Sequence, residues 1–290
     1  MQADFVVVNG KKKLMFIKHD GRHIQSELKI PCNQCIGCRL EYSRKWAVRI
    51  LHEASLWEDN CFLTLTYDDY YLPKGNTLVK KHFQDFMKRL RYYLDDKVIR
   101  YYMCGEYGDK NDRPHYHCCL FNHDFADKEL WKVTGGGHNL YISQELDKIW
   151  GNGRCIIGDL SFDSASYVAR YVLKKVRGSL AKDHYGDREP EYSSMSLKPG
   201  IGADWYVRWA SDCYPSDNIV VNGVYQKPPP FYDNMLKSDN PELYEEIKKR
   251  RMEKAKDKFD NTPERLKVRG ECKELMLKKL SRRYEECYDL

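Results

Sequence analysis

The stretch CGEYGDKNDRPHYHCCLF, residues 104–121, restricts the fold more than any other part of the chain. Apolar and aromatic residues fill its two ends, whereas charged residues, glycine, asparagine and proline fill its middle. This pattern predicts two strands, 97–108 and 114–121, joined by the polar segment between them as a hairpin. The two strands are therefore expected to be antiparallel neighbours in one sheet.

Hydrophobic periodicity over the preceding and following segments predicts strands that alternate with helices. The expected strands are 4–8, 13–17, 61–67 and 153–162, and the expected helices are 36–57, 79–94, 143–150 and 164–177. Because hairpin-joined strands dominate, we expect an α+β fold with a central antiparallel sheet and helices packed on it.

The chain after Arg177 changes in character. The expected elements are a polar loop over 184–202, a tight-turn hairpin over 218–226, a stiff proline linker over 227–236 and a C-terminal helical extension of one or two charged helices from Pro241 onward.

Composition limits the class of protein. The chain has 290 residues, 42% of them apolar, which is enough for one large domain with appendages. No apolar run approaches a membrane span and the N-terminus lacks the pattern of a secretory signal, so we expect a cytoplasmic protein with no membrane partner. A net charge of +6 and 22 tyrosines suit binding to single-stranded nucleic acid, although most tyrosines are expected at core margins.

Two histidines in the predicted hairpin form a candidate metal site. His115 and His117 are two residues apart, so in a strand their side chains project from the same face. Glu106 lies on the paired strand and can complete the site. Carboxylate and imidazole together suit Mg²⁺ or Mn²⁺ acting on phosphate better than a closed structural zinc. The alternative is a pair of strand histidines that only form hydrogen bonds.

The predicted helix DSASYVARYVLKKV carries candidate nucleophiles. Tyr167, Tyr171 and Lys174 share one side, and the apolar residues share the opposite, core-facing side. Asp163 or Ser164 can cap the helix. A phenol can attack phosphorus beside a metal ion while a lysine manages charge. The alternative is an amphipathic helix whose polar face happens to hold these residues.

The cysteines suggest a second metal site. The chain has 11 cysteines, and Cys32, Cys35 and Cys38 follow a C-x-x-C-x-x-C spacing before a predicted helix. In a reducing cytosol this spacing indicates either buried thiols or a structural Zn²⁺ site. Such a zinc site needs a fourth ligand, for which Cys61, His52 or a later cysteine is a candidate.

Three motifs, FLTLTYDD, RPHYH and YVARYVLKK, resemble in that order the motifs of the HUH endonuclease superfamily. More narrowly, the chain resembles the replication-initiation proteins of microviruses, the small single-stranded DNA bacteriophages, and above all their gokushovirus branch. The cysteine block PCNQCIGCRLEYSRKWAVRILHE resembles the N-terminal block of that branch. The resemblance extends from Pro31 to Val176 and continues weakly through MSLKPGIG.

The resemblance implies a ferredoxin-like or RRM-like sheet and a role for each candidate residue. His115, His117 and Glu106 would bind a divalent ion, and Tyr167 and Tyr171 would be catalytic with help from Lys174. The implied function is a rolling-circle initiator that nicks and rejoins single-stranded origin DNA through a 5′-phosphotyrosine. The implied partners are origin DNA, a host helicase and a host DNA polymerase in the bacterial cytoplasm.

The same interpretation divides the chain into an N-terminal segment with the cysteine block, an endonuclease core, a loop-and-hairpin region and charged C-terminal helices, at 1–60, 61–180, 181–235 and 236–290. Two other classes of function remain as alternatives. One is a non-catalytic, zinc-stabilised protein that binds single-stranded nucleic acid. The other is a small-molecule metalloenzyme that uses His115 and His117.

Overall fold

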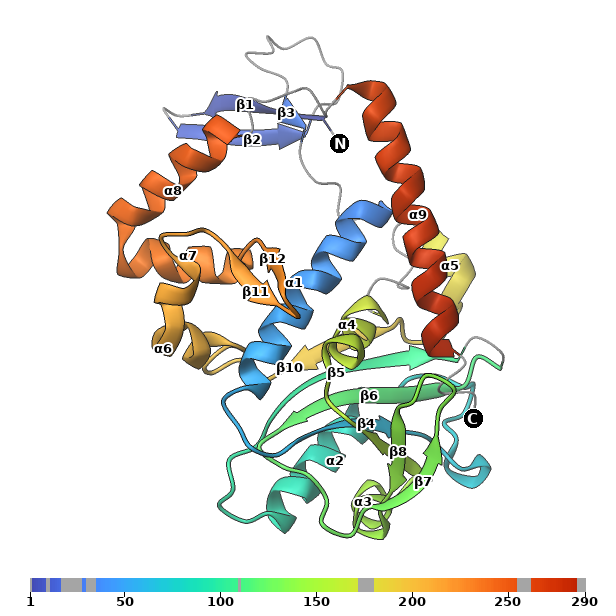
Figure 1. Ribbon diagram of the computed structural model, residues 1–290. Helices are drawn as coiled ribbons and strands as arrows, with labels where there is room; N and C mark the ends of the chain where they lie inside the picture. Colours follow the sequence, from blue (N-terminus) through green and yellow to red (C-terminus); the bar gives the residue numbers. More distant parts are fainter. Residues whose placement is uncertain are drawn as a thin grey trace.

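The computed structural model in Figure 1 describes residues 2–8, 11–16, 28–29, 35–108, 111–171, 180–254 and 262–285. Its centre is a seven-stranded antiparallel sheet in the order β10-β5-β6-β4-β9-β8-β7. The strands are β4 Asn60–Leu65, β5 Arg100–Tyr107, β6 Pro114–Phe121, β7 Glu129–Val133, β8 Asn139–Ile142, β9 Cys155–Gly158 and β10 Tyr192–Met195. The α+β class expected from the sequence is therefore confirmed.

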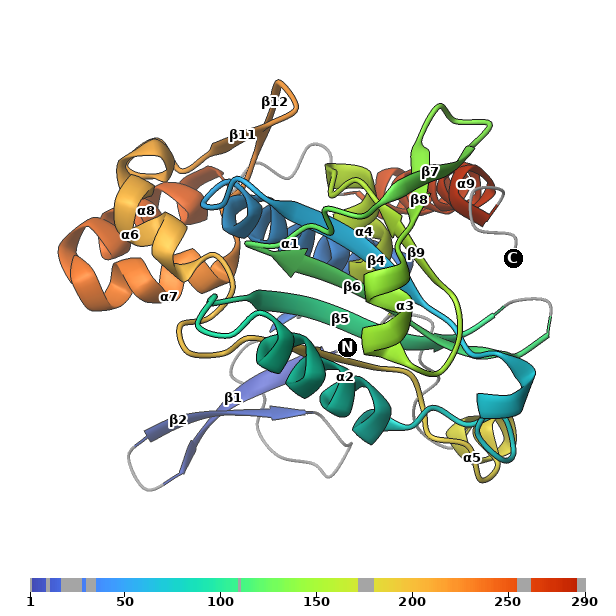
Figure 2. The same ribbon diagram turned by 90° about the horizontal axis from the view of Figure 1, so that it is seen from below.

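Helices cover both faces of this sheet, as Figure 2 shows from the side. Helices α2 (Lys80–Tyr93) and α3 (Gln144–Trp150) pack on one face, where Tyr116, Cys118 and Leu120 of β6 are buried against them. Helices α1 (Ile36–Ala54) and α4 (Phe162–Tyr171) pack on the other face, together with Cys119 and Phe121. The strand alternation thus separates two apolar layers, each closed by its own pair of helices.

The C-terminal part builds a third apolar cluster against Val48 of α1. Its elements are α6 Ala203–Cys213, β11 Ile219–Val221, β12 Val224–Gln226, α7 Pro230–Asp239 and α8 Pro241–Lys254. The remaining elements are β1 Gln2–Val8, β2 Lys11–Phe16, β3 Leu28–Lys29, the 3₁₀ turn η1 Asp69–Tyr71, α5 Leu180–Tyr185 and α9 Pro263–Glu285. No helix in the described part of the chain has both the length and the apolar character needed to cross a bilayer.

A buried ion pair joins α1, the sheet and the segment SLKPGIG. The guanidinium Nε of Arg100 lies 2.6 Å from Oε1 of Glu53, and both side chains are almost fully buried. The other carboxylate oxygen of Glu53 accepts a hydrogen bond from the backbone N–H of Gly202 at 2.7 Å. Gly202 has a φ of +76°, and a Cβ there would lie 2.7 Å from the hydroxyl of Tyr232, so only glycine fits.

Several elements differ from the sequence-based expectation. The segment predicted as a loop over 184–202 contains β10, which pairs with β5 at the sheet edge. The predicted linker over 227–236 is mostly helix α7, because Pro230 occupies the first helical turn, where its missing N–H is not needed. Strands β7 and β8 and helix α6 are absent from the sequence-based prediction. The hairpin around Asn222-Gly223 is confirmed, with both residues at positive φ.

Candidate metal centre

The β5–β6 hairpin brings the three predicted ligands together. Its register places Glu106 directly opposite His115, and Cys104 opposite His117. Because Glu106 is two residues beyond Cys104, its side chain emerges on the same face as both histidines. This face is the one covered by α1 and α4. The hairpin and the shared face of His115 and His117 are thus confirmed.

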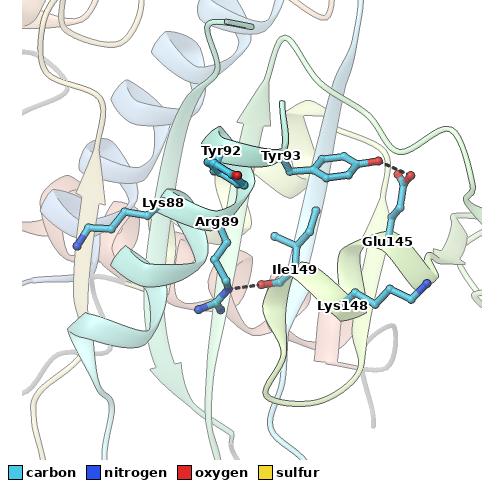
Figure 3. A pocket seen from close by; sticks show the side chains of 7 residues that line it. All are labelled: Lys88, Arg89, Tyr92, Tyr93, Glu145, Lys148 and Ile149. Carbon is cyan, nitrogen blue, oxygen red and sulfur yellow. Dashed lines mark hydrogen bonds between the residues drawn. The ribbon is translucent and has the colours of Figure 1, made fainter. Parts of the chain in front are cut away.

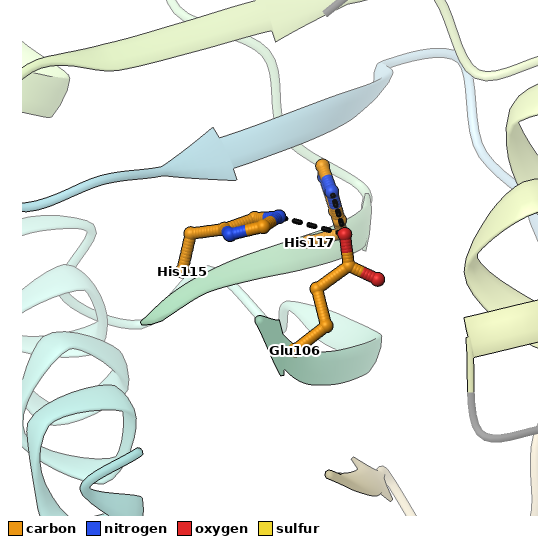
Figure 4. Close-up of side chains that lie close together, drawn as sticks. All are labelled: Glu106, His115 and His117. Atoms are coloured by element: carbon orange, nitrogen blue, oxygen red, sulfur yellow. Dashed lines mark hydrogen bonds and ion pairs between the residues drawn. The ribbon is translucent and has the colours of Figure 1, made fainter. Parts of the chain in front are cut away.

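Figure 4 shows the carboxylate of Glu106 lying between the two imidazoles. Its Oε1 lies 2.7 Å from Nε2 of His115 and 3.2 Å from Nε2 of His117. One ligand atom from each side chain falls within 4.8 Å of the other two, so the group can hold a metal ion. Glu106 and His117 are buried, whereas the His115 side chain is 18% exposed. The centre is therefore closed on one side and accessible from the side of His115.

Hydrogen bonds at the second ring nitrogen orient both imidazoles. Nδ1 of His115 donates to the backbone carbonyl of Arg113 at 3.1 Å. Nδ1 of His117 lies 3.0 Å from Oγ1 of Thr64, which faces His117 across the β4–β6 ladder. A carbonyl can only accept, so neutral His115 carries its proton on Nδ1 and presents the Nε2 lone pair to the centre. Metal-binding histidines in proteins are held in this way.

The state of Glu106 also fits a cation. Burial alone would raise the pKa of its carboxyl group, but the charges of His115 and His117 and their hydrogen bonds outweigh burial and lower that pKa. The second oxygen, Oε2, is buried and has no hydrogen-bond partner among the described residues. An ionised carboxylate with an unpartnered buried oxygen beside two imidazole nitrogens is a suitable ligand set for a divalent ion.

Tyr167 lies next to the metal centre. Its ring meets the ring of His117 edge-on, with 5.2 Å between centroids and 78° between planes. Phe62 of β4 also stacks on His117, with centroids 5.4 Å apart. Tyr167 is only 6% exposed, so its predicted position on the side of α4 away from the core is wrong. The physical reason is that α4 packs against both the sheet and α1, where Ser43 Oγ donates to the carbonyl of Ser166 at 2.9 Å.

A pair of serines begins helix α4. The backbone N–H of Ser164 donates to Oγ of Ser161 at 3.2 Å, and the N–H of Ser161 donates to Oγ of Ser164 at 2.8 Å. This reciprocal arrangement is a capping box, with Ser161 as the N-cap. The sequence-based candidates for the cap are Asp163 and Ser164. The helix begins earlier than expected, so Tyr167 lies more than one turn inside it.

Other predicted site residues lie partly or wholly outside the described structure. Tyr171 is the last residue of α4, and its side chain lies outside the described residues, as do Lys174 and Cys32. Cys35 is exposed and Cys38 is half-buried at the start of α1. The grouping of Tyr167, Tyr171 and Lys174 on one catalytic face therefore stays a prediction.

The described residues do not bring Cys61 or His52 into a metal-binding group with Cys35 and Cys38. Cys61 is a buried thiol whose pKa is raised by burial, and its Sγ donates to the carbonyl of His123. His52 is stacked on Trp205, with ring centroids 3.5 Å apart. The zinc site thus remains a prediction whose fourth ligand has to come from elsewhere.

Sequence reasoning did not identify Thr64 or Arg113 as residues that orient the ligands. Thr64 lies in the motif FLTLTY, and alternation along β4 predicts which side chains share a face. Only the register between β4 and β6, which the sequence does not contain, shows that Thr64 is the residue opposite His117.

A separate pocket lies between α2 and α3, on the sheet face opposite the metal centre (Figure 3). Arg89 closes one side by donating from Nε to the carbonyl of Ile149 at 2.6 Å. The lining residues are Lys88, Arg89, Tyr92, Tyr93, Glu145, Lys148 and Ile149. None of them belongs to the metal centre, so the two sites are separated by the sheet.

Comparisons with known proteins agree on one family. The model of a family described as replication-associated protein ORF2 matches residues 60–176, which contain the sheet motifs and α4. The chain is 34% identical to replication-associated protein VP4 of Bdellovibrio phage phiMH2K, over 88% of this chain and 86% of the relative. It is 34% identical to replication-associated protein ORF2 of Spiroplasma virus 4, over 78% and 73%, and 31% identical to replication-associated protein ORF4 of Chlamydia phage 1, over 75% and 56%. No solved structure gave a significant match.

Proposed function

The chain belongs to the family of replication-associated proteins of microvirus-like bacteriophages, and from that premise we propose that it initiates rolling-circle replication by nicking and rejoining single-stranded origin DNA. The single observation that carries the proposal is the buried Glu106–His115–His117 group with the ring of Tyr167 against His117. A phenol beside a site suited to a divalent ion is what a tyrosine transesterase requires.

The ligand set favours Mg²⁺ or Mn²⁺. A bound ion of this kind would draw charge from the non-bridging oxygens of the scissile phosphate. Glu106 and His117 hold their positions because they are buried, and Thr64 fixes the ring of His117. His115 is partly exposed, which leaves its side of the centre open to the phosphate.

The chemistry is an exchange of phosphodiester bonds. A tyrosine gives up its phenolic proton, its oxygen bonds to phosphorus, and the bond from phosphorus to the 3′ oxygen breaks. The leaving oxygen takes up a proton and becomes a 3′-hydroxyl, while the 5′ end stays on the tyrosine. No nucleotide hydrolysis is needed, because the phosphotyrosine conserves the free energy of the broken bond.

Two tyrosines on α4 would allow a second exchange. After one round of synthesis, the second tyrosine of the pair Tyr167 and Tyr171 would cleave the regenerated origin. The new 3′-hydroxyl would then attack the first phosphotyrosine and close a circle, with Lys174 assisting by its charge. The sequence contains no Gly-x-x-x-x-Gly-Lys-Ser/Thr motif, so unwinding would fall to a host helicase and synthesis to a host polymerase in the bacterial cytoplasm.

A denaturing gel tests the proposal. The protein is incubated with single-stranded oligonucleotides that tile the viral origin region, with Mn²⁺ or with chelator. We expect a shifted, protease-sensitive band with Mn²⁺ only, because a phosphotyrosine bond survives denaturation. Tight binding of the same oligonucleotides without any such band would instead support the non-catalytic nucleic-acid-binding function.

A further inference from the structure

Two tyrosines project from the turn that follows β4. Tyr70 is 90% exposed and Tyr71 is 47% exposed, both on η1. Their ring centroids are 5.0 Å apart and the ring planes are perpendicular. Together they present two aromatic surfaces to solvent, side by side and at right angles, on a turn of three residues.

This tyrosine pair lies at the same end of the sheet as the metal centre. Arg113, at the start of β6, places Nη1 2.7 Å from Oδ1 of Asp69 and donates from Nη2 to the carbonyl of Tyr67 at 2.7 Å. The carbonyl of the same Arg113 accepts the hydrogen bond from Nδ1 of His115. One residue therefore contacts both the turn that carries the tyrosines and a metal ligand. In Figure 2 this turn, in cyan, lies beside the end of the β5–β6 hairpin.

The turn is held rigidly. The backbone N–H of Asp68 donates to the carbonyl of Asn152 at 2.9 Å, and the N–H of Tyr71 donates to the carbonyl of Asp68 at 3.0 Å. At Gly153 a Cβ would lie 2.4 Å from the backbone nitrogen of Asp68, so the two segments are in close contact. A ligand that binds the exposed rings would find them already ordered, which reduces the entropy lost on binding.

The surroundings suit the backbone and bases of a single strand. Exposed tyrosine rings stack on unpaired bases of any sequence, because every base has a flat π surface. Lys74 and Arg154 are exposed close to the ends of η1 and β4, and Arg113 neutralises Asp69. Cationic side chains near an aromatic pair attract phosphate while the rings contact the bases.

We propose that Tyr70 and Tyr71 form a base-stacking platform for the single strand that flanks the phosphate at the metal centre. This inference rests on the proposed nicking function for its choice of ligand. Of the strongly exposed tyrosines, Tyr92 on α2 is 91% exposed but lies on the other face of the sheet. Tyr92 therefore offers a control with equal exposure on the face away from His115.

Fluorescence anisotropy with a labelled origin oligonucleotide, in chelator, measures stacking without chemistry. Tyr70→Ala and Tyr71→Ala should each weaken binding about tenfold, which corresponds to about 1.4 kcal/mol, within the range found for stacking of one base on an aromatic ring. Tyr70→Phe, Tyr71→Phe and Tyr92→Ala should bind like the unmodified protein. An oligonucleotide with abasic sites beside the nick should abolish the difference between the unmodified protein and the double alanine variant.

Unchanged affinity of the double alanine variant would overturn the platform, whether or not the protein nicks. Loss of the covalent adduct in Tyr70→Phe or Tyr71→Phe would also overturn it, because the phenol oxygen would then be the nucleophile. Weakened binding in the alanine variants of a protein that forms no adduct would support the platform and reject the nicking function. The two proposals can thus fail separately.

Discussion

The ring of Tyr167 contacts the ring of His117 edge-on, with centroids 5.2 Å apart. The two residues come from different elements, since His117 is on β6 and Tyr167 is on α4. The contact means that the candidate nucleophile and a candidate metal ligand share one packing environment. Substitutions at either residue must therefore be chosen so that they change chemistry without opening a cavity.

Removal of either histidine should abolish ion binding. We expect His115→Ala and His117→Ala to lower the affinity for Mn²⁺ by roughly tenfold or more and to stop nicking, while affinity for single-stranded DNA is largely kept. Glu106→Gln should weaken ion affinity more than it reduces activity at saturating Mn²⁺. Isothermal titration calorimetry measures the ion, with the exposed His184→Ala as control. Full nicking by the double histidine variant in chelator would contradict the assignment.

Phenylalanine at the two tyrosines should separate cleavage from circularisation. Tyr167→Phe and Tyr171→Phe keep the ring and remove only the nucleophilic oxygen, so each variant should fold and bind DNA normally. At least one single variant should still form the covalent adduct, neither should release circles efficiently, and the double variant should form no adduct. Tyr225→Phe, at a 75% exposed tyrosine on β12, serves as the control. Adduct formed by the double variant would place the nucleophile on another tyrosine.

Breaking the buried Glu53–Arg100 pair should strongly destabilise the fold. Glu53→Gln or Arg100→Met leaves one buried charge without its partner, which typically costs about 3–5 kcal/mol in the free energy of unfolding. Lys81→Met removes the exposed pair with Asp85 on α2 and should change stability by less than about 1 kcal/mol. Urea unfolding measures both. Equal, small effects would show that Arg100 contributes through packing alone.

His52 should make the fold sensitive to acid. Burial between Trp205 and Tyr232 lowers the pKa of His52 to about 4 from the ordinary 6.5. Between these values the unfolded chain takes up a proton at His52 and the folded chain does not, so stability falls as pH drops from 6.5 to 4. The loss attributable to His52 should reach about 3 kcal/mol at about 1.4 kcal/mol per pKa unit. Urea unfolding of His52→Gln across this range should lack that component, whereas an identical pH profile would show that His52 does not cause it.

The cysteine block should carry zinc. We expect about one equivalent of zinc to purify with the protein and Cys35→Ser or Cys38→Ser to lower both zinc content and melting temperature. Cys272→Ser, at an exposed cysteine on α9, should change neither quantity. Elemental analysis and thermal unfolding give the two readouts. A zinc-free protein that is equally stable after substitution would favour the buried-thiol interpretation.

The metal centre could be predicted from the sequence because its geometry follows from local rules. A strand repeats every two residues, so His115 and His117 share a face wherever the strand lies. The polar segment between the strands indicates a hairpin, which brings Glu106 near them. What the sequence could not provide was the register that sets Glu106 opposite His115 and Thr64 opposite His117, since several registers satisfy the same alternation.

Other features depend on contacts between distant segments. The burial of Tyr167 requires α1 to lie on α4, and the periodicity of α4 alone contains no information about α1. Strand β10 consists largely of polar residues, with the sequence YSSM, and becomes a strand because the edge of β5 offers it hydrogen bonds. Pro229 and Pro230 resemble a linker in isolation, yet they begin α7.

The ion ligands and the tyrosine helix come from separate segments of the chain. All three ligands belong to one hairpin, whose short sequence separation allows it to form early during folding, before α4 has docked on α1. Mutations in α1, for example at Ser43, would then shift the tyrosine and leave the ligands in place. Evolution could therefore tune the reactivity of the nucleophile and the affinity for the ion independently, because no residue encodes both.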